Sequence, residues 1–334
     1  MVESHQGSRH TRRVITVALM ALLLASAAAW AQTSPAYPAK PIRLIVPFTA
    51  GGPTDILARV IGQKLNETFG PQVIVDNRPG ANGNIGTELV AKSPPDGYTL
   101  LLASAGILTV NPSLHSRLPF DVTRDLAPVT LATSITNVLV VHPALPVKSV
   151  QDFIRLAQSR PGQLSYASAG TGSASHLAME LLKSTARVDI LHVPYKGATP
   201  GITDLMGGHV QVMLIGLPGA LPPVSAGRLK ALAVSSLRRS PAVPELPTIA
   251  ESRLPGFEVI NWLGVLAPAG TPRDIITKLN QEIVKGLQQP DTKAKLVSQG
   301  FETMGGTPEQ FAAYMKSETA KWAKVVKATG AKAD

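Results

Sequence analysis

The feature of this sequence that most limits the fold is a strand-like segment followed by a glycine turn and a helix, within residues 42–69. Residues 42–46 are mainly apolar, and the chain then turns through residues 47–52. From Pro53 onward, apolar residues recur every three or four positions, which predicts one face of a helix. The first turn of such a helix directs unpaired N–H groups and the positive end of its dipole toward the glycine turn. The segment can therefore bind an anion without a basic side chain.

A second segment, residues 164–182, repeats this pattern. Residues 164–167 predict a strand, residues 168–173 form a turn of small residues, and Leu177, Leu181 and Leu182 suit a helix. Two anion-binding turns indicate one ligand with polar groups at both ends, or a single carboxylate held by both. Hydrogen bonds to a charged group contribute about 1.5–3 kcal/mol each. A few of them, less the costs of ordering and desolvation, are compatible with an affinity near the micromolar level.

Apolar strand-like runs alternate with helix-like segments along the rest of the chain, which predicts an α/β fold with mainly parallel sheets flanked by helices. Two C-terminal helices are capped by residues 271–274 and 307–310, and a proline-rich connector is predicted between about 236 and 272. Further strands are expected at residues 72–75, 98–103, 137–141, 190–193, 210–215 and 229–234, and a helix at residues 84–92.

The N-terminal residues have the pattern of a secretory signal peptide. Arginines at positions 9, 12 and 13 precede an apolar run at residues 14–30, which ends in Ala29-Trp30-Ala31. The run is short for a membrane anchor, so we expect cleavage after Ala31 and a periplasmic location. The chain has no cysteine, which excludes disulfides and thiolate metal sites. The net charge is +10, but the basic residues are scattered along the chain and only 4% of residues are aromatic. We therefore expect no nucleic-acid binding.

Six motifs in the chain resemble the Bug/TctC family, the extracytoplasmic solute-binding proteins of tripartite tricarboxylate transporters. The resemblance runs from about residue 37 to residue 327, with one departure at Asn82, where the family commonly has glycine. The motifs are residues 47–55 (PFTAGGPTD), 75–81 (VDNRPGA), 84–86 (NIG), 93–98 (SPPDGY), 192–197 (HVPYKG) and 266–272 (LAPAGTP).

The resemblance implies a periplasmic-binding-protein-like fold of two α/β domains with a ligand cleft between them. Residues 36–136 and 257–334 would form domain 1, and residues 137–256 would form domain 2. The expected function is capture of a small organic carboxylate by a monomer that closes on it and delivers it to a membrane permease or a sensor. No enzymatic activity, cofactor or metal is expected. The motifs do not distinguish dicarboxylates, tricarboxylates, amino acids and aromatic acids.

Both glycine turns supply the predicted ligand contacts, mainly through backbone N–H groups. Asp55 is expected either to interact with the helix dipole or to bind an amino or hydroxyl group of the ligand. Ser104 follows a strand and either lines the cleft or caps the next segment, and Thr199 is a candidate hydrogen-bond donor. The predicted ligand-binding residues are Phe48, Ala50, Gly51, Gly52, Thr54, Asp55, Ser104, Ala169, Gly170, Thr171, Gly172, Ser173, His176 and Thr199.

Two other functions remain as alternatives: an exported hydrolase that uses Ser173 and His176, and a surface interaction module without a small ligand. Thr171 stands where a G-x-S-x-G motif would have its first glycine, and no orienting acid can be identified for the Ser–His pair. The other histidines have no metal-binding spacing. Gly80, Gly83 and Gly86 are spaced G-x-x-G-x-x-G, which is not the dinucleotide fingerprint.

Overall fold

The predicted first segment forms strand β1 (Ile42–Val46) and helix α2 (Pro53–Phe69) in the computed structural model, which describes residues 37–70 and 73–329. Helix α2 begins at Pro53 as predicted, because a proline at the first helical position loses no intrahelical hydrogen bond. The apolar face of α2, which includes Leu57, Ile61 and Leu65, is buried. The predicted signal peptide, residues 1–31, lies outside the described residues.

The second segment also folds as predicted, into β5 (Ser165–Ser168) and α7 (Ala174–Ala186), with Ser173 as the N-cap. The other strands are β2 (Val73–Asn77), β3 (Thr99–Ser104), β4 (Leu126–Val141), β6 (Leu191–Pro194), β7 (Val212–Gly216), β8 (Lys230–Val234), β9 (Ile260–Pro268) and β10 (Phe301–Thr303). The other helices are α3 (Asn84–Ala91), α4 (Asn111–Leu114), α5 (Val122–Asp125), α6 (Val150–Ser159), α8 (Ala198–Met206), α9 (Leu217–Ser225), α10 (Arg273–Gln288), α11 (Pro290–Ser298) and α12 (Pro308–Thr329), with short helical turns η1 (Ala81–Gly83), η2 (Gly106–Val110) and η3 (Ala250–Ser252).

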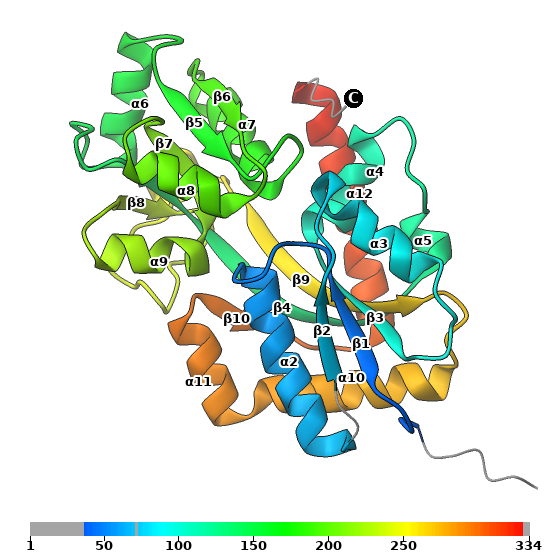
Figure 1. Ribbon diagram of the computed structural model, residues 1–334. Coiled ribbons are helices and arrows are strands. Elements are labelled where there is room, and N and C mark those ends of the chain that lie inside the picture. Colours follow the sequence, from blue (N-terminus) through cyan, green and yellow to red (C-terminus); the bar gives the residue numbers. More distant parts are fainter. Residues whose placement is uncertain (1–36, 71–72, 330–334) are drawn as a thin grey trace, which may run out of the picture. The chain divides into compact units, whose positions relative to one another are not determined.

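Strand β4 connects two groups of parallel strands in a ten-stranded sheet (Figure 1). Eight strands follow the order β2-β1-β3-β9-β4-β7-β5-β6, and β8 and β10 also pair with β4. β1 pairs in parallel with β2 and β3, and β5 pairs in parallel with β6 and β7. β4 changes partners along its length: Thr136 lies opposite Ile260 of β9, and Asn137 lies opposite Gly216 of β7. The chain therefore has the predicted α/β class, with antiparallel strands β4 and β9 between the two parallel groups.

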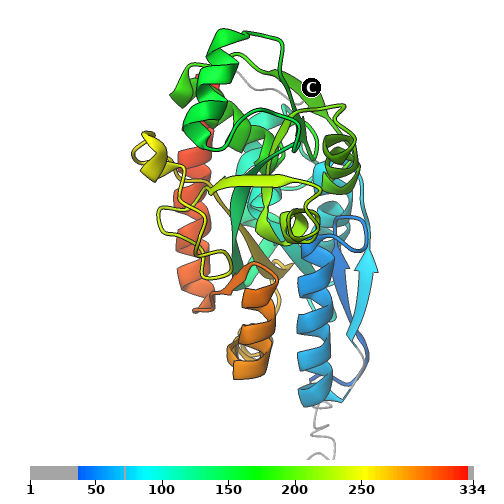
Figure 2. The same ribbon diagram turned by 90° about the vertical axis from the view of Figure 1, so that its left-hand side faces the viewer.

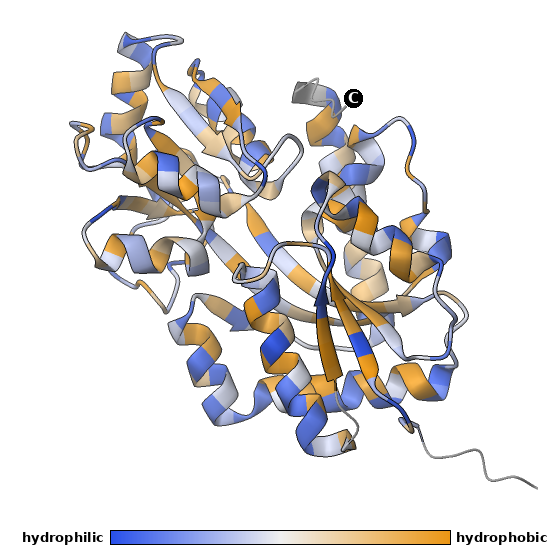
Figure 3. Ribbon diagram, in the orientation of Figure 1, coloured by the Kyte–Doolittle hydropathy of each residue, from blue (hydrophilic) through white to orange (hydrophobic). Residues whose placement is uncertain are grey.

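The sheet is covered on both faces, so consecutive apolar side chains of strands such as β3 are buried. Ile45 and Leu101 belong to one cluster with Ile107 of η2 and Phe311 of α12. In Figure 2, α12 runs along the opposite side of the unit from α2. Figure 3 shows mostly hydrophobic strands, whereas the helices alternate between hydrophobic and hydrophilic residues, as expected for helices with one buried face. Within residues 37–70 and 73–329, no helix combines the length and the apolar character that a membrane crossing requires.

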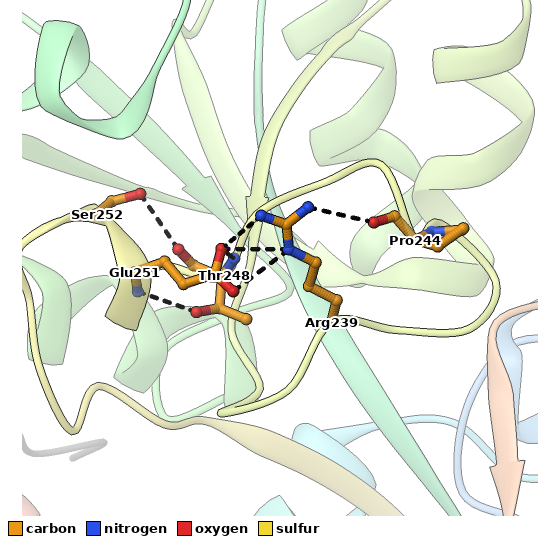
Figure 4. Close-up of polar contacts among 5 residues, drawn as sticks. All are labelled: Arg239, Pro244, Thr248, Glu251 and Ser252. Atoms are coloured by element: carbon orange, nitrogen blue, oxygen red, sulfur yellow. Dashed lines mark hydrogen bonds and ion pairs between the residues drawn. The ribbon is translucent and has the colours of Figure 1, made fainter.

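The predicted connector at residues 236–272 is partly wrong, because residues 260–268 form the central strand β9. The prolines and glycines around this segment suggested a connector, although its apolar, β-branched and aromatic residues are typical of a strand. Trp262 is fully buried and meets Phe311 edge-on, with the ring centroids 5.6 Å apart. The segment before β9 is held by the ion pair of Arg239 with Glu251 (2.9 Å) and by Thr248 Oγ1, which accepts the Glu251 N–H (Figure 4).

Candidate ligand-binding site

The predicted site residues lie after the carboxyl ends of the parallel strands, where open α/β sheets bind ligands. The first glycine turn (residues 47–52) follows β1, a loop at residues 78–84 follows β2, and Ser104 ends β3. In the other group, the second glycine turn (residues 168–173) follows β5, and residues 195–199 follow β6.

Asp55 organises the first glycine turn. Its Oδ2 accepts the N–H of Gly51 (2.9 Å) and the Nε–H of Arg59 (2.9 Å). The Asp55 side chain is buried, which by itself raises its pKa, but hydrogen bonds from Arg59, Gly51 and Asn77 bring the pKa below the ordinary value. These contacts favour the predicted role of Asp55 at the start of the helix over binding of an amino or hydroxyl group of the ligand. Gly51 has a φ of +80°, in the left-handed region that favours glycine.

The start of α2 nevertheless offers unpaired donors. Among the described residues, the N–H groups of Thr54 and Asp55 have no hydrogen-bond acceptor, whereas Gly52 closes a hydrogen-bonded turn that begins at Thr49. Ala50 is exposed and Thr54 is buried. Phe48 is half-buried, and its carbonyl accepts the Nδ2–H of Asn77 (3.0 Å). The first turn thus has fewer available donors than predicted, since Gly51 and Gly52 are already paired.

Side chains accept hydrogen bonds from several N–H groups of the second glycine turn. Three donors that were predicted for the ligand are paired in this way: Ala169 N–H with Ser175 Oγ (2.9 Å), Gly170 N–H with Ser168 Oγ (3.2 Å) and Gly172 N–H with His176 Nδ1 (3.0 Å). Ser173 donates its N–H to the carbonyl of Gly170, and its Oγ accepts the His176 N–H as a helix cap. In the described part of the chain, the N–H groups of Thr171, Ala174 and Ser175 have no acceptor.

The second glycine turn faces residues that follow β2 and β3. A methyl group built on Gly172 would lie 2.3 Å from Leu114 Cδ1 and 3.8 Å from Asn82 Nδ2. One built on Gly106 would lie 3.8 Å from Ser104 Oγ and 4.0 Å from the Ala174 nitrogen. Ser104 is therefore near the start of α7, whereas Thr199 is an exposed residue of α8.

Three asparagines, here called the asparagine cluster (Asn82, Asn84 and Asn111), support the loop after β2. Asn111 is fully buried and donates its Nδ2–H to Asn84 Oδ1 (2.7 Å). Asn82 donates its Nδ2–H to Asn111 Oδ1 (3.1 Å) and has a left-handed φ of +50°. The residue that departs from the family pattern thus fits its backbone position, and its amide lies beside the second glycine turn.

Behind the second glycine turn, His176 and His192 form a stacked pair, the histidine pair, with their ring centroids 4.2 Å apart. His192 Nε2 lies 2.7 Å from Ser168 Oγ. Burial lowers the pKa of both histidines, and the neighbouring His176 further lowers that of His192, to about 4. Glu180 opposes this shift, but it already accepts hydrogen bonds from Tyr166 and Lys183, so both rings are neutral at neutral pH.

Acid should destabilise the protein through the histidine pair. The unfolded chain binds a proton at His192 below about pH 6.5, whereas the folded chain does so only near pH 4. Between these values the unfolded state binds more protons, so the free energy of unfolding should fall by about 1–3 kcal/mol as pH drops through this window. Urea unfolding at several pH values measures the slope. His192→Gln should flatten it; an unchanged slope in that variant would contradict this assignment.

The alternative of a hydrolytic pair formed by Ser173 and His176 does not fit the geometry. Ser173 Oγ lies 3.1 Å from Ser175 Oγ and accepts the main-chain N–H of His176, while the His176 ring accepts the Gly172 N–H. No proton-accepting ring nitrogen therefore faces the serine. Among residues 37–70 and 73–329, no group of three or more His, Cys, Asp or Glu side chains is placed to hold a metal ion.

The sequence did not reveal several residues of this region. Asn111 and Ser168 carry no local signal, since their roles depend on partners brought together by the fold. The pairing of β5 with β6 offered one clue, because parallel neighbours bring His192 beside Tyr166 in register.

Comparisons with known proteins identify the family of this chain. The family model described as tripartite tricarboxylate transporter family receptor (TctC) matches residues 57–331. Protein BugT of Bordetella pertussis is 40% identical over 318 residues, covering 95% of this chain and 98% of BugT. Two solved structures are also similar. R. palustris Rpa4515 with adipate is 40% identical, with a TM-score of 0.86, and the match covers 89% of this chain and 99% of that one. MatC from Rhodopseudomonas palustris with bound malate is 33% identical, with a TM-score of 0.81, and the match covers 87% of this chain and 100% of that one. The chain therefore belongs to the TctC family of periplasmic solute-binding proteins, which are not enzymes.

Proposed function

We propose that this protein binds a small organic carboxylate between the two glycine turns, through N–H groups at the starts of α2 and α7. The observation that carries the proposal is the set of backbone donors that have no acceptor in the described part of the chain: those of Thr54 and Asp55 at the start of α2, and those of Thr171 and Ala174 at the start of α7. A carboxylate has lone pairs for several such donors, and each helix dipole favours the negative charge.

The surroundings of these donors support an anionic ligand over a cationic one. The carboxylate of Asp55 is already engaged by Gly51 and Arg59, so it does not present an unpaired negative charge. The neighbouring polar side chains, Ser104 and Asn82, are uncharged. The similar proteins with adipate and malate favour a carboxylate with a second polar end.

The partner change of β4 supports closure of two lobes on the ligand. We propose that residues 36–136 with 257–334 form one lobe and residues 137–256 the other. The lobes would meet where Gly172 faces Asn82 and Leu114. By the same family relationship, the ligand-bound monomer, processed after Ala31, would deliver its cargo to a membrane permease of the tripartite type or to a sensor.

A thermal-shift screen with succinate, malate, adipate and citrate, followed by calorimetry, tests the binding proposal. At about 100 times its Kd, a ligand stabilises the folded state by about 2.7 kcal/mol, which raises Tm by several degrees. The diamide of the best acid is the matched control, because it keeps the carbon chain and removes the charge. Equal stabilisation by acid and diamide, or none by any acid, would contradict carboxylate recognition.

A further inference from the structure

We propose that His176 is a positioning residue that does not contact the ligand: it accepts the Gly172 N–H and so holds the second glycine turn with the N–H groups of Thr171 and Ala174 available to the anion. This inference rests on the proposed function, and it removes Gly172 N–H from the predicted ligand donors.

The hydrogen bond from Gly172 decides the state of the His176 ring. The Gly172 nitrogen and His176 Nδ1 are 3.0 Å apart, and the proton between them belongs to the Gly172 N–H. Nδ1 is therefore unprotonated, and the proton of the neutral ring is on Nε2. Gly172 is buried, so water cannot readily replace the histidine. A buried N–H without an acceptor costs about 1–3 kcal/mol, enough to make the turn adopt another conformation.

His192 fixes the same turn from its other side. Ser168 Oγ, which lies beside His192 Nε2, accepts the N–H of Gly170. The parallel stacking of the two rings, with planes 18° apart, restricts rotation of the His176 ring. Both imidazoles are thus joined to backbone N–H groups of the turn, one directly and one through a hydroxyl.

The groups packed around the histidine pair keep it neutral. Glu180 on α7 would favour a protonated ring, but Lys183 on the same helix and Tyr166 on β5 both donate to its Oε1 (2.8 and 2.6 Å). Strand β7 contributes apolar Val212 and Leu214 to this core. Helix α12 adds Trp322 and Val326 to the same cluster. A neutral acceptor at Nδ1 is therefore compatible with these neighbours of α7.

Two substitutions separate an acceptor role from a packing role. His176→Leu fills the space but accepts no hydrogen bond, and should weaken binding of the acids named above by about tenfold or more. His176→Asn is smaller, yet its Oδ1 can occupy the position of Nδ1, and should bind within about threefold of the natural protein. Calorimetry on the mature chain gives both affinities, and nitrogen-15 NMR gives the protonation site of His176.

The proposal is supported if the ring carries its proton on Nε2 and only the leucine variant loses affinity. A proton on Nδ1, a leucine variant that binds normally, or an asparagine variant as weak as the leucine variant would each overturn it. If the leucine variant does not fold, the asparagine variant and the NMR signature still decide. If the natural protein binds none of the acids, the proposed function and this inference fail together, while the NMR signature shows separately whether the histidine contact exists.

Discussion

Gly172→Ala should weaken carboxylate binding by roughly tenfold to a hundredfold, the loss expected from disturbing one or two hydrogen bonds to a charged ligand. Gly172 has a φ of +79°, a conformation that costs alanine about 1–2 kcal/mol. The added methyl group would also lie 2.3 Å from Cδ1 of the buried Leu114 side chain, so either that side chain or the turn has to shift. The prediction follows from a shift of the turn, which carries the donors of Thr171 and Ala174 with it.

Gly227→Ala is the matched control for this substitution. Gly227 follows α9, has a φ of +67° and would place its methyl group in open space. The variant should lose about 1 kcal/mol of stability from backbone strain and keep its ligand affinity. Calorimetry on both variants separates strain from displacement of the turn. Equal affinities for the two variants would show that the contact between Gly172 and Leu114 does not position the ligand donors.

The parts of the fold that could be predicted from sequence are those with local signals. Both strand–turn–helix segments were located correctly, because an apolar strand, a glycine turn and helical apolar periodicity lie within a few positions of one another. Strand β9 was missed, since prolines and glycines on both sides of residues 260–268 outweighed its pattern. Burial of Trp262 against Phe311 depends on packing of α12, which no local window contains.

The candidate site shows the same limit at the level of single hydrogen bonds. Sequence located the glycine turns but could not tell which N–H groups were already paired. Whether Asp55 turns back to Gly51 or outward depends on side-chain orientation, and both outcomes suit a helix start. The hydrogen bond from Asn82 to Asn111 joins residues 29 positions apart, and only tertiary structure creates it.

Asp55→Ala should lower the free energy of unfolding by about 2–3 kcal/mol, because hydrogen bonds to a buried charged group contribute about 1.5–3 kcal/mol. The buried carboxylate accepts from Gly51 and Arg59, but the arginine side chain is 60% exposed, so the ion pair itself contributes little. Most of the loss should come from the turn, which the Gly51 N–H no longer ties to the buried carboxylate of α2. Urea unfolding measures the change, and carboxylate affinity should decrease in the same variant.

Asp274→Ala is the control, since Asp274 is an exposed carboxylate in the first turn of α10 and interacts mainly with the helix dipole. The Asp274→Ala substitution should lower the free energy of unfolding by only about 0.3–1 kcal/mol. The pKa of Asp55 is lowered in the folded protein, so its contribution is present above pH 3.8, the ordinary value, and is lost as pH falls through the folded pKa. The stability difference between the natural protein and Asp55→Ala should therefore shrink in acid. Equal losses for the two alanine variants at neutral pH would mean that Asp55 acts only as a dipole partner and does not hold the first glycine turn.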